Sequence, residues 1–76
     1  MTAREVIRII EGRGGVLLRQ RGSRCQYEAR AILVDGTEVS ARTTVAQHAG
    51  DVRPGTLRAI ERDLEPVFGK GWLKGR

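Results

Sequence analysis

The sequence predicts an α+β fold in the order helix, strand, strand, strand, helix, with a three-stranded antiparallel sheet. Two observations support this prediction. Apolar residues recur at helical spacing near both ends of the chain, and between them two alternating stretches flank Asp35-Gly36, a typical hairpin turn. Because only one sheet face is apolar enough to need covering, we expect both helices to pack on that face.

The first helix is expected from Thr2 to Glu11. Thr2 followed by Glu5 forms a capping box, in which the two side chains bond free N–H groups of the first turn. Glycines then end the helix. The apolar stripe consists of Ala3, Val6, Ile7 and Ile10, and the glycines are Gly12, Gly14 and Gly15.

Three strands are expected next. The first runs from Val16 to Gln20 and leads into a Gly22-Ser23 turn, the second runs from Arg24 to about Val34, and the third runs from Thr37 to about Ala46. Alternation places one set of second-strand side chains inward, namely Cys25, Tyr27, Ala29, Ala31 and Leu33. The set that shares one face of the third strand is Val39, Ala41, Thr43 and Val45.

A second helix is expected from about Thr56 to Glu65, after a loop over residues 47–55. Pro66 should end it, because the residue before a proline avoids the helical conformation. We expect Phe68 and Trp72 to fold back onto the body. The domain prediction is a single domain over residues 1–76, with residues 67–76 as a partly loose tail. The buried stripe of this helix consists of Leu57, Ile60 and Leu64.

Composition restricts the function classes. Fourteen Lys and Arg against nine Asp and Glu give a net charge of +5, which makes nucleic acid the first partner class to consider. One cysteine and one histidine supply neither an internal disulfide nor a zinc site, so we expect no metal and no cofactor. The sequence has no apolar run of membrane-spanning length and no signal-peptide pattern at its start, which predicts a cytoplasmic protein without membrane contact.

Arginines crowd around the Gly22-Ser23 turn. Arg19 and Arg21 lie two positions apart on a strand and share a face, and Arg24 follows the turn beside them. Because a guanidinium matches phosphate oxygens in a bidentate way, this corner predicts a phosphate-binding site. Tyr27 either packs under the sheet or stacks an RNA base. The RNA-binding candidates are Arg19, Arg21, Ser23, Gln26 and Tyr27.

Four segments, in order, resemble the HicA toxins of bacterial toxin–antitoxin pairs. The segments are residues 3–11 (AREVIRIIE), Arg21-Gly22-Ser23 with Gln26-Tyr27, residues 47–51 (QHAGD) and residues 54–60 (PGTLRAI). The resemblance extends over nearly the whole chain. It implies a fold like a double-stranded-RNA-binding domain, a metal-independent ribonuclease that acts on mRNA to arrest translation, and a HicB-type antitoxin as partner.

One position departs from the family pattern. The family motif is Gly-Ser-His with a catalytic histidine, and here Arg24 holds that place. RNA cleavage without a metal needs a group that accepts the proton of the ribose 2′-hydroxyl, and imidazole suits this role because it titrates near neutral pH. A guanidinium stays protonated, so Arg24 is able to stabilise phosphate charge but not to act as the base.

Three hypotheses explain this departure, in our order of preference. The chain carries an inactivating substitution, made or selected because an active toxin harms the cell that produces it. Alternatively, it is a degenerate relative that kept binding and lost cleavage, or its base has moved to His48. The end of the third strand lies near the start of the second in an antiparallel pair, so His48 is expected to approach Arg24. A lone histidine in a polar loop is more often structural than catalytic.

Two function classes therefore stay open, an RNA-cleaving toxin that lacks its histidine and a non-catalytic module that binds RNA or an antitoxin. An exposed cationic corner complements an acidic inhibitor, which is the physical argument for an antitoxin partner. Direct DNA binding ranks low, because the whole sheet separates the helices and excludes a helix-turn-helix. Cys25 is expected to be an inward apolar residue rather than a nucleophile.

Overall fold

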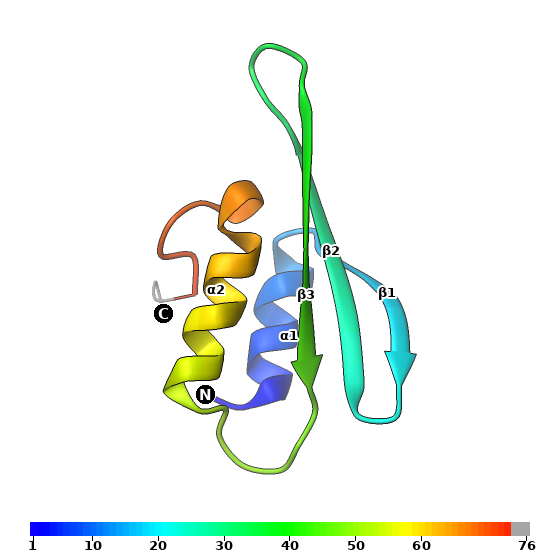
Figure 1. The fold of residues 1–76 in the computed structure, drawn as a ribbon, viewed down its shortest axis with the longest axis vertical. Coiled ribbons are helices and arrows are strands. Elements are labelled where there is room, and N and C mark those ends of the chain that lie inside the picture. Colours follow the sequence, from blue (N-terminus) through cyan, green and yellow to red (C-terminus); the bar gives the residue numbers. More distant parts are fainter. Residues whose placement is uncertain (74–76) are drawn as a thin grey trace.

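The computed structural model describes residues 1–73, within which two helices cover one face of a three-stranded antiparallel sheet (Figure 1). The strands are ordered β1-β2-β3, so β2 is central. The predicted α+β class and element order are confirmed, and the fold is consistent with a double-stranded-RNA-binding-domain-like architecture. The elements are α1 (Ala3–Gly12), β1 (Val16–Arg21), β2 (Arg24–Ile32), β3 (Glu38–Ala46) and α2 (Pro54–Phe68).

Strands β2 and β3 pair along their whole lengths, and their register brings the predicted inward residues together. Cys25 lies opposite Val45, and Tyr27 lies opposite Thr43. All of these side chains are buried, as is Ala29 further along β2. The apolar face of the sheet is therefore the face that packs against the helices.

The loop between β2 and β3 is one residue longer than the shortest hairpin turn. The N–H of Leu33 donates to the carbonyl of Thr37 at 2.8 Å, which leaves residues 34–36 as the loop. Gly36 has a φ of 87°, a left-handed conformation that favours glycine. The carboxylate of Asp35 accepts a hydrogen bond from the N–H of Thr37 at 2.9 Å. The hairpin predicted from these residues is thus present, with a three-residue loop.

The far half of this hairpin extends beyond both helices (Figure 1). β2 ends at Ile32 rather than at Val34, because the ladder ends at the Ile32–Glu38 pair and the hairpin loop follows. Leu33, which we expected to face the helices, is 45% exposed, and Val34 is fully exposed at the tip. Burial of the inward face continues only as far as the helices reach.

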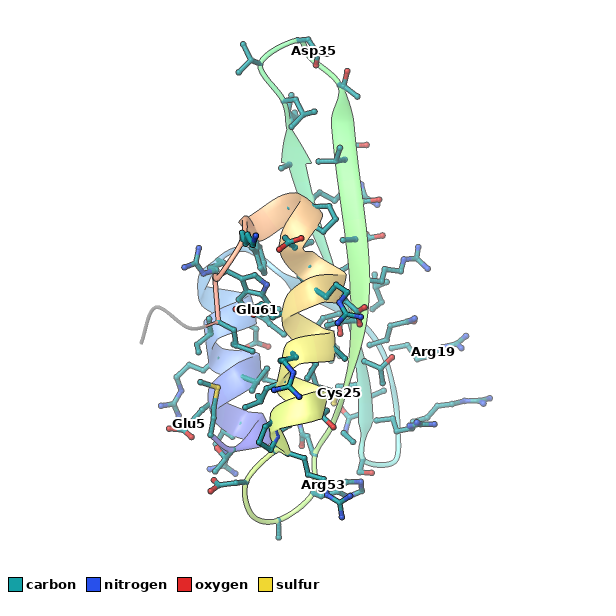
Figure 2. The ribbon with its side chains drawn as sticks, turned by 60° about the vertical axis from the view of Figure 1, so that its left-hand side comes forward. Glu5, Arg19, Cys25, Asp35, Arg53 and Glu61 are labelled. Carbon is teal, nitrogen blue, oxygen red and sulfur yellow. The ribbon has the colours of Figure 1, made fainter. Side chains whose placement is uncertain are left out.

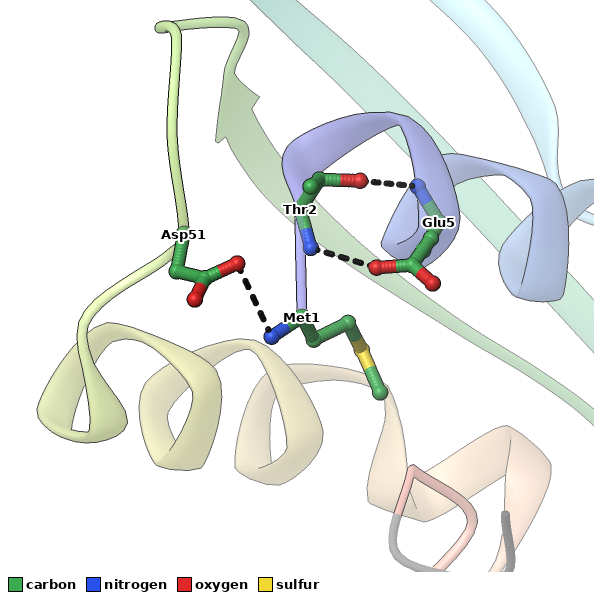
Figure 3. Close-up of polar contacts among 4 residues, drawn as sticks. All are labelled: Met1, Thr2, Glu5 and Asp51. Carbon is green, nitrogen blue, oxygen red and sulfur yellow. Dashed lines mark hydrogen bonds and ion pairs between the residues drawn. The ribbon is translucent and has the colours of Figure 1, made fainter.

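Helix α1 begins with the predicted capping box (Figure 3). The Thr2 hydroxyl accepts a hydrogen bond from the N–H of Glu5 at 3.2 Å, and the Glu5 carboxylate accepts one from the N–H of Thr2 at 2.7 Å. The Met1 ammonium lies 3.4 Å from the Asp51 carboxylate, and the Met1 carbonyl accepts a bond from the N–H of Val52 at 2.7 Å. These contacts join the start of α1 to the loop before α2.

A continuous hydrophobic core fills the space between the sheet and the helices. A polar contact crosses it, in which the buried Thr43 hydroxyl donates to the Asp63 carboxylate at 2.9 Å and ties β3 to α2. The buried apolar residues come from both helices, from β2 and β3, and from the segment after α2. They are Ala3, Val6, Ile7, Ile10, Cys25, Tyr27, Ala29, Val45, Ile60, Leu64, Trp72 and Leu73.

Helix α2 is longer than predicted at both ends. It begins with Pro54, whose fixed φ suits the first helical position, and it continues through Pro66 to Phe68. The prediction that Pro66 ends the helix is wrong. The missing N–H of Pro66 removes a bond only in the last turn, and the N–H of Gly69 closes the helix by donating to the Glu65 carbonyl at 2.9 Å. Even at this length, no helix among residues 1–73 is long and apolar enough to cross a membrane.

After α2 the chain turns back against the helix. Trp72 and Leu73 are buried, and the indole N–H of Trp72 donates to the Glu61 carbonyl at 2.8 Å. The rings of Phe68 and Trp72 meet edge to face, with 5.1 Å between their centroids. The expected return of Phe68 and Trp72 onto the body is confirmed. The last part of the predicted loose tail, residues 74–76, lies outside the described residues.

Gly15 is a position where we predict that a methyl group is not tolerated. A Cβ atom there would lie 2.9 Å from the carbonyl oxygen of Ile10 and would also overlap the buried Ile10 side chain. Gly15→Ala should lower the free energy of unfolding by about 1–3 kcal/mol, the usual cost of overpacking, in a urea titration. Gly12→Ala is the matched control, because a Cβ at Gly12 meets nothing within 4 Å. Equal losses in both variants would contradict this steric explanation.

Candidate functional site

The side chains of the predicted arginine corner gather on the sheet face that the helices leave uncovered. Arg21 pairs with Arg24 across the ladder, and Arg19 pairs with Gln26 on the next exposed rung. Together with Thr44 of β3, these side chains line a shallow depression of about 260 Å³. Figure 2 shows Arg19 on the side of the sheet opposite the helices. We call this site the arginine depression.

A β-bulge in β1 determines which side chains reach the depression. The register shifts between Leu17, which pairs with Tyr27, and Arg19, which pairs with Gln26. Tyr27 and Gln26 are neighbours on β2 and therefore point to opposite faces. The extra residue lets Leu17 share the helix-covered face while Arg19 and Arg21 share the exposed face. Regular alternation would have put Leu17 and Arg19 on the same face.

Arg21 and Arg24 face each other although both are positively charged. Like charges at directly paired positions destabilise a sheet, by roughly up to 1 kcal/mol. Both residues are exposed, so solvent screens their repulsion in the free protein. An anion between them would relieve it, because each guanidinium presents its donors in a fixed fork. The arginine depression is therefore chemically suited to a phosphate or a carboxylate.

The Gly22-Ser23 turn anchors this corner to the end of β3. Gly22 has a φ of 57°, a conformation that glycine adopts without steric cost. The Ser23 carbonyl accepts a hydrogen bond from the N–H of Gln47 at 2.6 Å, and the side-chain amide of Gln20 donates to the Gly22 carbonyl at 3.1 Å. Ser23, one of the RNA-binding candidates, therefore lies beside the depression rather than in its lining.

Comparison with known proteins assigns the chain to a family. The family model described as "HicA toxin of bacterial toxin-antitoxin" matches residues 3–65, which is most of the chain. The chain belongs to the HicA toxin family. It is therefore a toxin of a toxin–antitoxin system, and membership implies an antitoxin as partner. The searches of curated proteins and of solved structures found no match.

Tyr27 does not share the exposed face of this HicA chain. Its side chain is 3% exposed, and its hydroxyl donates to the Glu11 carboxylate at 2.9 Å. Burial first, and then this hydrogen bond, raise the pKa of Tyr27 to about 12. The ring packs under the sheet, which was one of the two alternatives, and in this position it is not available to stack an RNA base. We therefore leave Tyr27 out of the proposed RNA surface.

His48, the single histidine of this HicA chain, lies past the end of β3 in an exposed position. It lines one depression with the start of α1, including Arg4, and another with the start of α2, including Arg53. Neither depression includes Arg24. The ladder pairs Arg24 with Ala46, two residues before His48, so the backbone at His48 follows directly on the strand end beside Arg24, while the depressions that His48 lines do not include Arg24.

Cys25 is a buried core residue, as the alternation of β2 predicts. Its sulfur accepts a hydrogen bond from the side-chain amide of Gln47 at 3.4 Å. At 1% exposure the thiol is not accessible as a nucleophile. Across residues 1–73, no group of three or more His, Cys, Asp or Glu side chains is placed to hold a metal ion.

Sequence reasoning missed a second charged cluster on the exposed sheet face. The Glu28 carboxylate lies 3.0 Å from Nε of Arg30 and 3.1 Å from Nε of Arg42. Its side chain is 9% exposed, whereas the two arginine side chains are 62% and 61% exposed. The hydrogen bond from Arg42, reinforced by Arg30, lowers the pKa of Glu28. Alternation placed Glu28 and Arg30 on this face, but the approach of Arg42 depends on the β2–β3 register.

The buried Tyr27 generates a pH prediction. A group whose pKa is raised by folding stabilises the protein below its unfolded pKa, and this contribution is lost as the pH rises through the folded pKa. The free energy of unfolding should therefore fall between pH 10 and about pH 12, by up to about 3 kcal/mol, in denaturant titrations across this range. Tyr27→Phe is the control, since it removes the titrating hydroxyl. An equally steep fall in Tyr27→Phe would assign the effect to other groups.

Proposed function

We propose that this HicA-family toxin acts on RNA and binds the RNA backbone in the arginine depression. The supporting observation is that Arg19, Arg21 and Arg24 converge there on one exposed surface, together with Gln26 and Thr44. The guanidinium groups supply bidentate donors to phosphate, and the amide and hydroxyl supply neutral donors and acceptors for ribose or a base. The proposed RNA is mRNA, which a toxin with its histidine base would cleave to arrest translation, and the proposed location is the cytoplasm.

Cleavage without a metal ion places two demands on the site. One group must accept the proton of the ribose 2′-hydroxyl, and another must stabilise the charge that develops on the phosphate. Arg24 meets only the second demand, because its guanidinium stays protonated. The described lining of the depression consists of three arginines, a glutamine and a threonine, which at neutral pH are not general bases. We therefore propose that this chain binds RNA and cleaves it poorly.

Glu28 and His48 are poor substitutes for the missing base. Glu28 lies four residues along β2 from Arg24, about 13 Å at the usual rise of a strand. Its pKa is lowered by Arg42 and Arg30, which makes its carboxylate a weaker base. His48 lines depressions that do not include Arg24. These observations favour loss of cleavage over relocation of the base.

We propose that the antitoxin is a HicB-type protein that covers the arginine depression. Acidic side chains on such an inhibitor would complement the arginines, speed association and occupy the donors that RNA needs. A chain that has lost cleavage keeps this surface. The second candidate function, a non-catalytic module that binds RNA or the antitoxin, therefore rests on the same depression.

We predict that Arg24→His restores metal-independent RNA cleavage. Imidazole supplies the base at the family's position, and general base catalysis contributes about 10²- to 10⁴-fold in rate. The measurement is induced expression of this chain and of the variant in bacteria, with growth and the integrity of bulk mRNA followed together. The variant should arrest growth and degrade mRNA, and the unchanged chain should do neither.

Arg21→His is the matched control, because it places an imidazole on the same rung of the sheet but on β1. Growth arrest by Arg24→His but not by Arg21→His supports the assigned position of the base. Toxicity of the unchanged chain that disappears in His48→Ala would place the base at His48 and contradict the proposal. If no variant arrests growth or degrades mRNA, the result would favour the non-catalytic module.

A further inference from the structure

Arg30 and Arg42 present unused hydrogen-bond donors on the exposed sheet face, outside the arginine depression. Each guanidinium contacts the Glu28 carboxylate through Nε. Among residues 1–73, these are the hydrogen bonds that the two side chains make, so their terminal amino groups remain available. Two guanidinium groups beside one carboxylate leave a local excess of positive charge.

Glu28 holds both guanidinium groups in place. Its side chain is 9% exposed, and its carboxylate is ionised at neutral pH and contacts Nε of both arginines. Because Nε of each arginine is engaged, the edge that bears the terminal amino groups is directed to other partners. Arginines fixed in this way lose less conformational freedom when they bind an anion than free surface arginines do. This arrangement is chemically suited to an anion.

We propose that Arg30 and Arg42, held by Glu28, form a second phosphate-binding site for the RNA that occupies the arginine depression, an inference that rests on the proposed function. Arg42 pairs with Glu28, which lies about 13 Å along β2 from Arg24. Arg30 lies about 20 Å along β2 from Arg24. An RNA strand that follows β2 reaches both sites. The two sites would then bind phosphates of the same RNA strand that are more than one nucleotide apart.

The surface between the two sites favours an RNA backbone over a protein partner. Gln26 and its partner Thr44, which line the side of the arginine depression nearer Glu28, are both polar. Phosphates and sugars are contacted by arginines together with such polar side chains, whereas protein interfaces usually centre on aromatic or apolar anchors. Of the exposed apolar side chains, Ile32, Leu33 and Val34 lie toward the hairpin tip, and Val16, Leu17 and Leu18 lie on β1, where Val16 pairs with Glu28. The preference for an RNA backbone therefore rests on the arginines and on the polar Gln26–Thr44 pair.

Fluorescence anisotropy with single-stranded RNA probes tests this inference. A trinucleotide is too short to span both sites and is expected to bind in the arginine depression, where three arginines converge, and a dodecamer reaches both sites. Both carry 2′-O-methyl groups, so that cleavage does not affect the measurement. For Arg30→Ala/Arg42→Ala, the slope of log affinity against log salt should decrease by about 1.4 with the dodecamer, since each single-strand phosphate contact contributes about 0.7. Trinucleotide binding should not change, which also shows that the variant is folded.

Two further double variants distinguish the effect of where the arginines lie from the effect of their charge alone. Arg8→Ala/Arg62→Ala removes the same charge from the exposed surfaces of the helices and should leave the dodecamer slope nearly unchanged. Arg30→Lys/Arg42→Lys keeps the charge but lacks the planar fork that contacts Glu28 and a phosphate together. It should recover less than half of the lost slope. Full recovery would overturn the role assigned to the Glu28 contacts.

The other outcomes are equally decisive. Equal weakening of trinucleotide binding and dodecamer binding, or equal effects of the sheet and helix variants, would overturn the second site.

Arg24→Ala should weaken the binding of both probes. If it does so while Arg30→Ala/Arg42→Ala changes neither, the second site fails and the proposed function stands. If the unchanged chain binds neither probe, the proposed RNA function itself fails. Loss of antitoxin binding with unchanged dodecamer binding would assign these arginines to the protein partner and overturn the inference.

Discussion

The pairing of β2 with β3 is the interaction on which the rest of the structure depends. Side chains alternate along each strand, so the register decides which of them enter the core and which face outward. With Cys25 opposite Val45 and Tyr27 opposite Thr43, the two apolar sets meet on one face. A shift of one residue would turn one of these sets toward solvent and leave the helices without an apolar surface to cover.

The same register builds the exposed face. It places Thr44 beside Gln26 in the arginine depression and Arg42 beside Glu28 further along β2. The core and the charged surface are therefore two products of one strand ladder. This arrangement puts the charged groups on a rigid element rather than a loop, and side chains on such elements hold their positions more precisely. The facing Arg21 and Arg24 add a local cost that the core has to offset.

Local patterns predicted most of the fold, and the features they missed depend on tertiary partners. The capping box, the helical stripes and the strand alternation each act within a few residues, so sequence alone reveals them. Three features depend on which residues of neighbouring strands pair with each other. They are the bulge between Leu17 and Arg19, the contact of Arg42 with Glu28, and the three-residue length of the hairpin loop. The extent of burial on β2 depends on where the helices stop. Pro66 disfavours helix locally, yet a single lost bond near the end of α2 does not outweigh the packing of that helix.

The residue at position 24 separates two properties that a histidine combines. A histidine contacts phosphate when protonated and accepts a proton when neutral, whereas an arginine is permanently in the first state. On the proposed function, Arg24 therefore removes catalysis while it preserves, and at neutral pH increases, the positive charge of the depression. RNA and an acidic antitoxin both respond to that charge, so neither type of binding requires the lost base. Binding to RNA or antitoxin is consequently no evidence of cleavage in this chain, and only the proton acceptor distinguishes the toxin from the binding module.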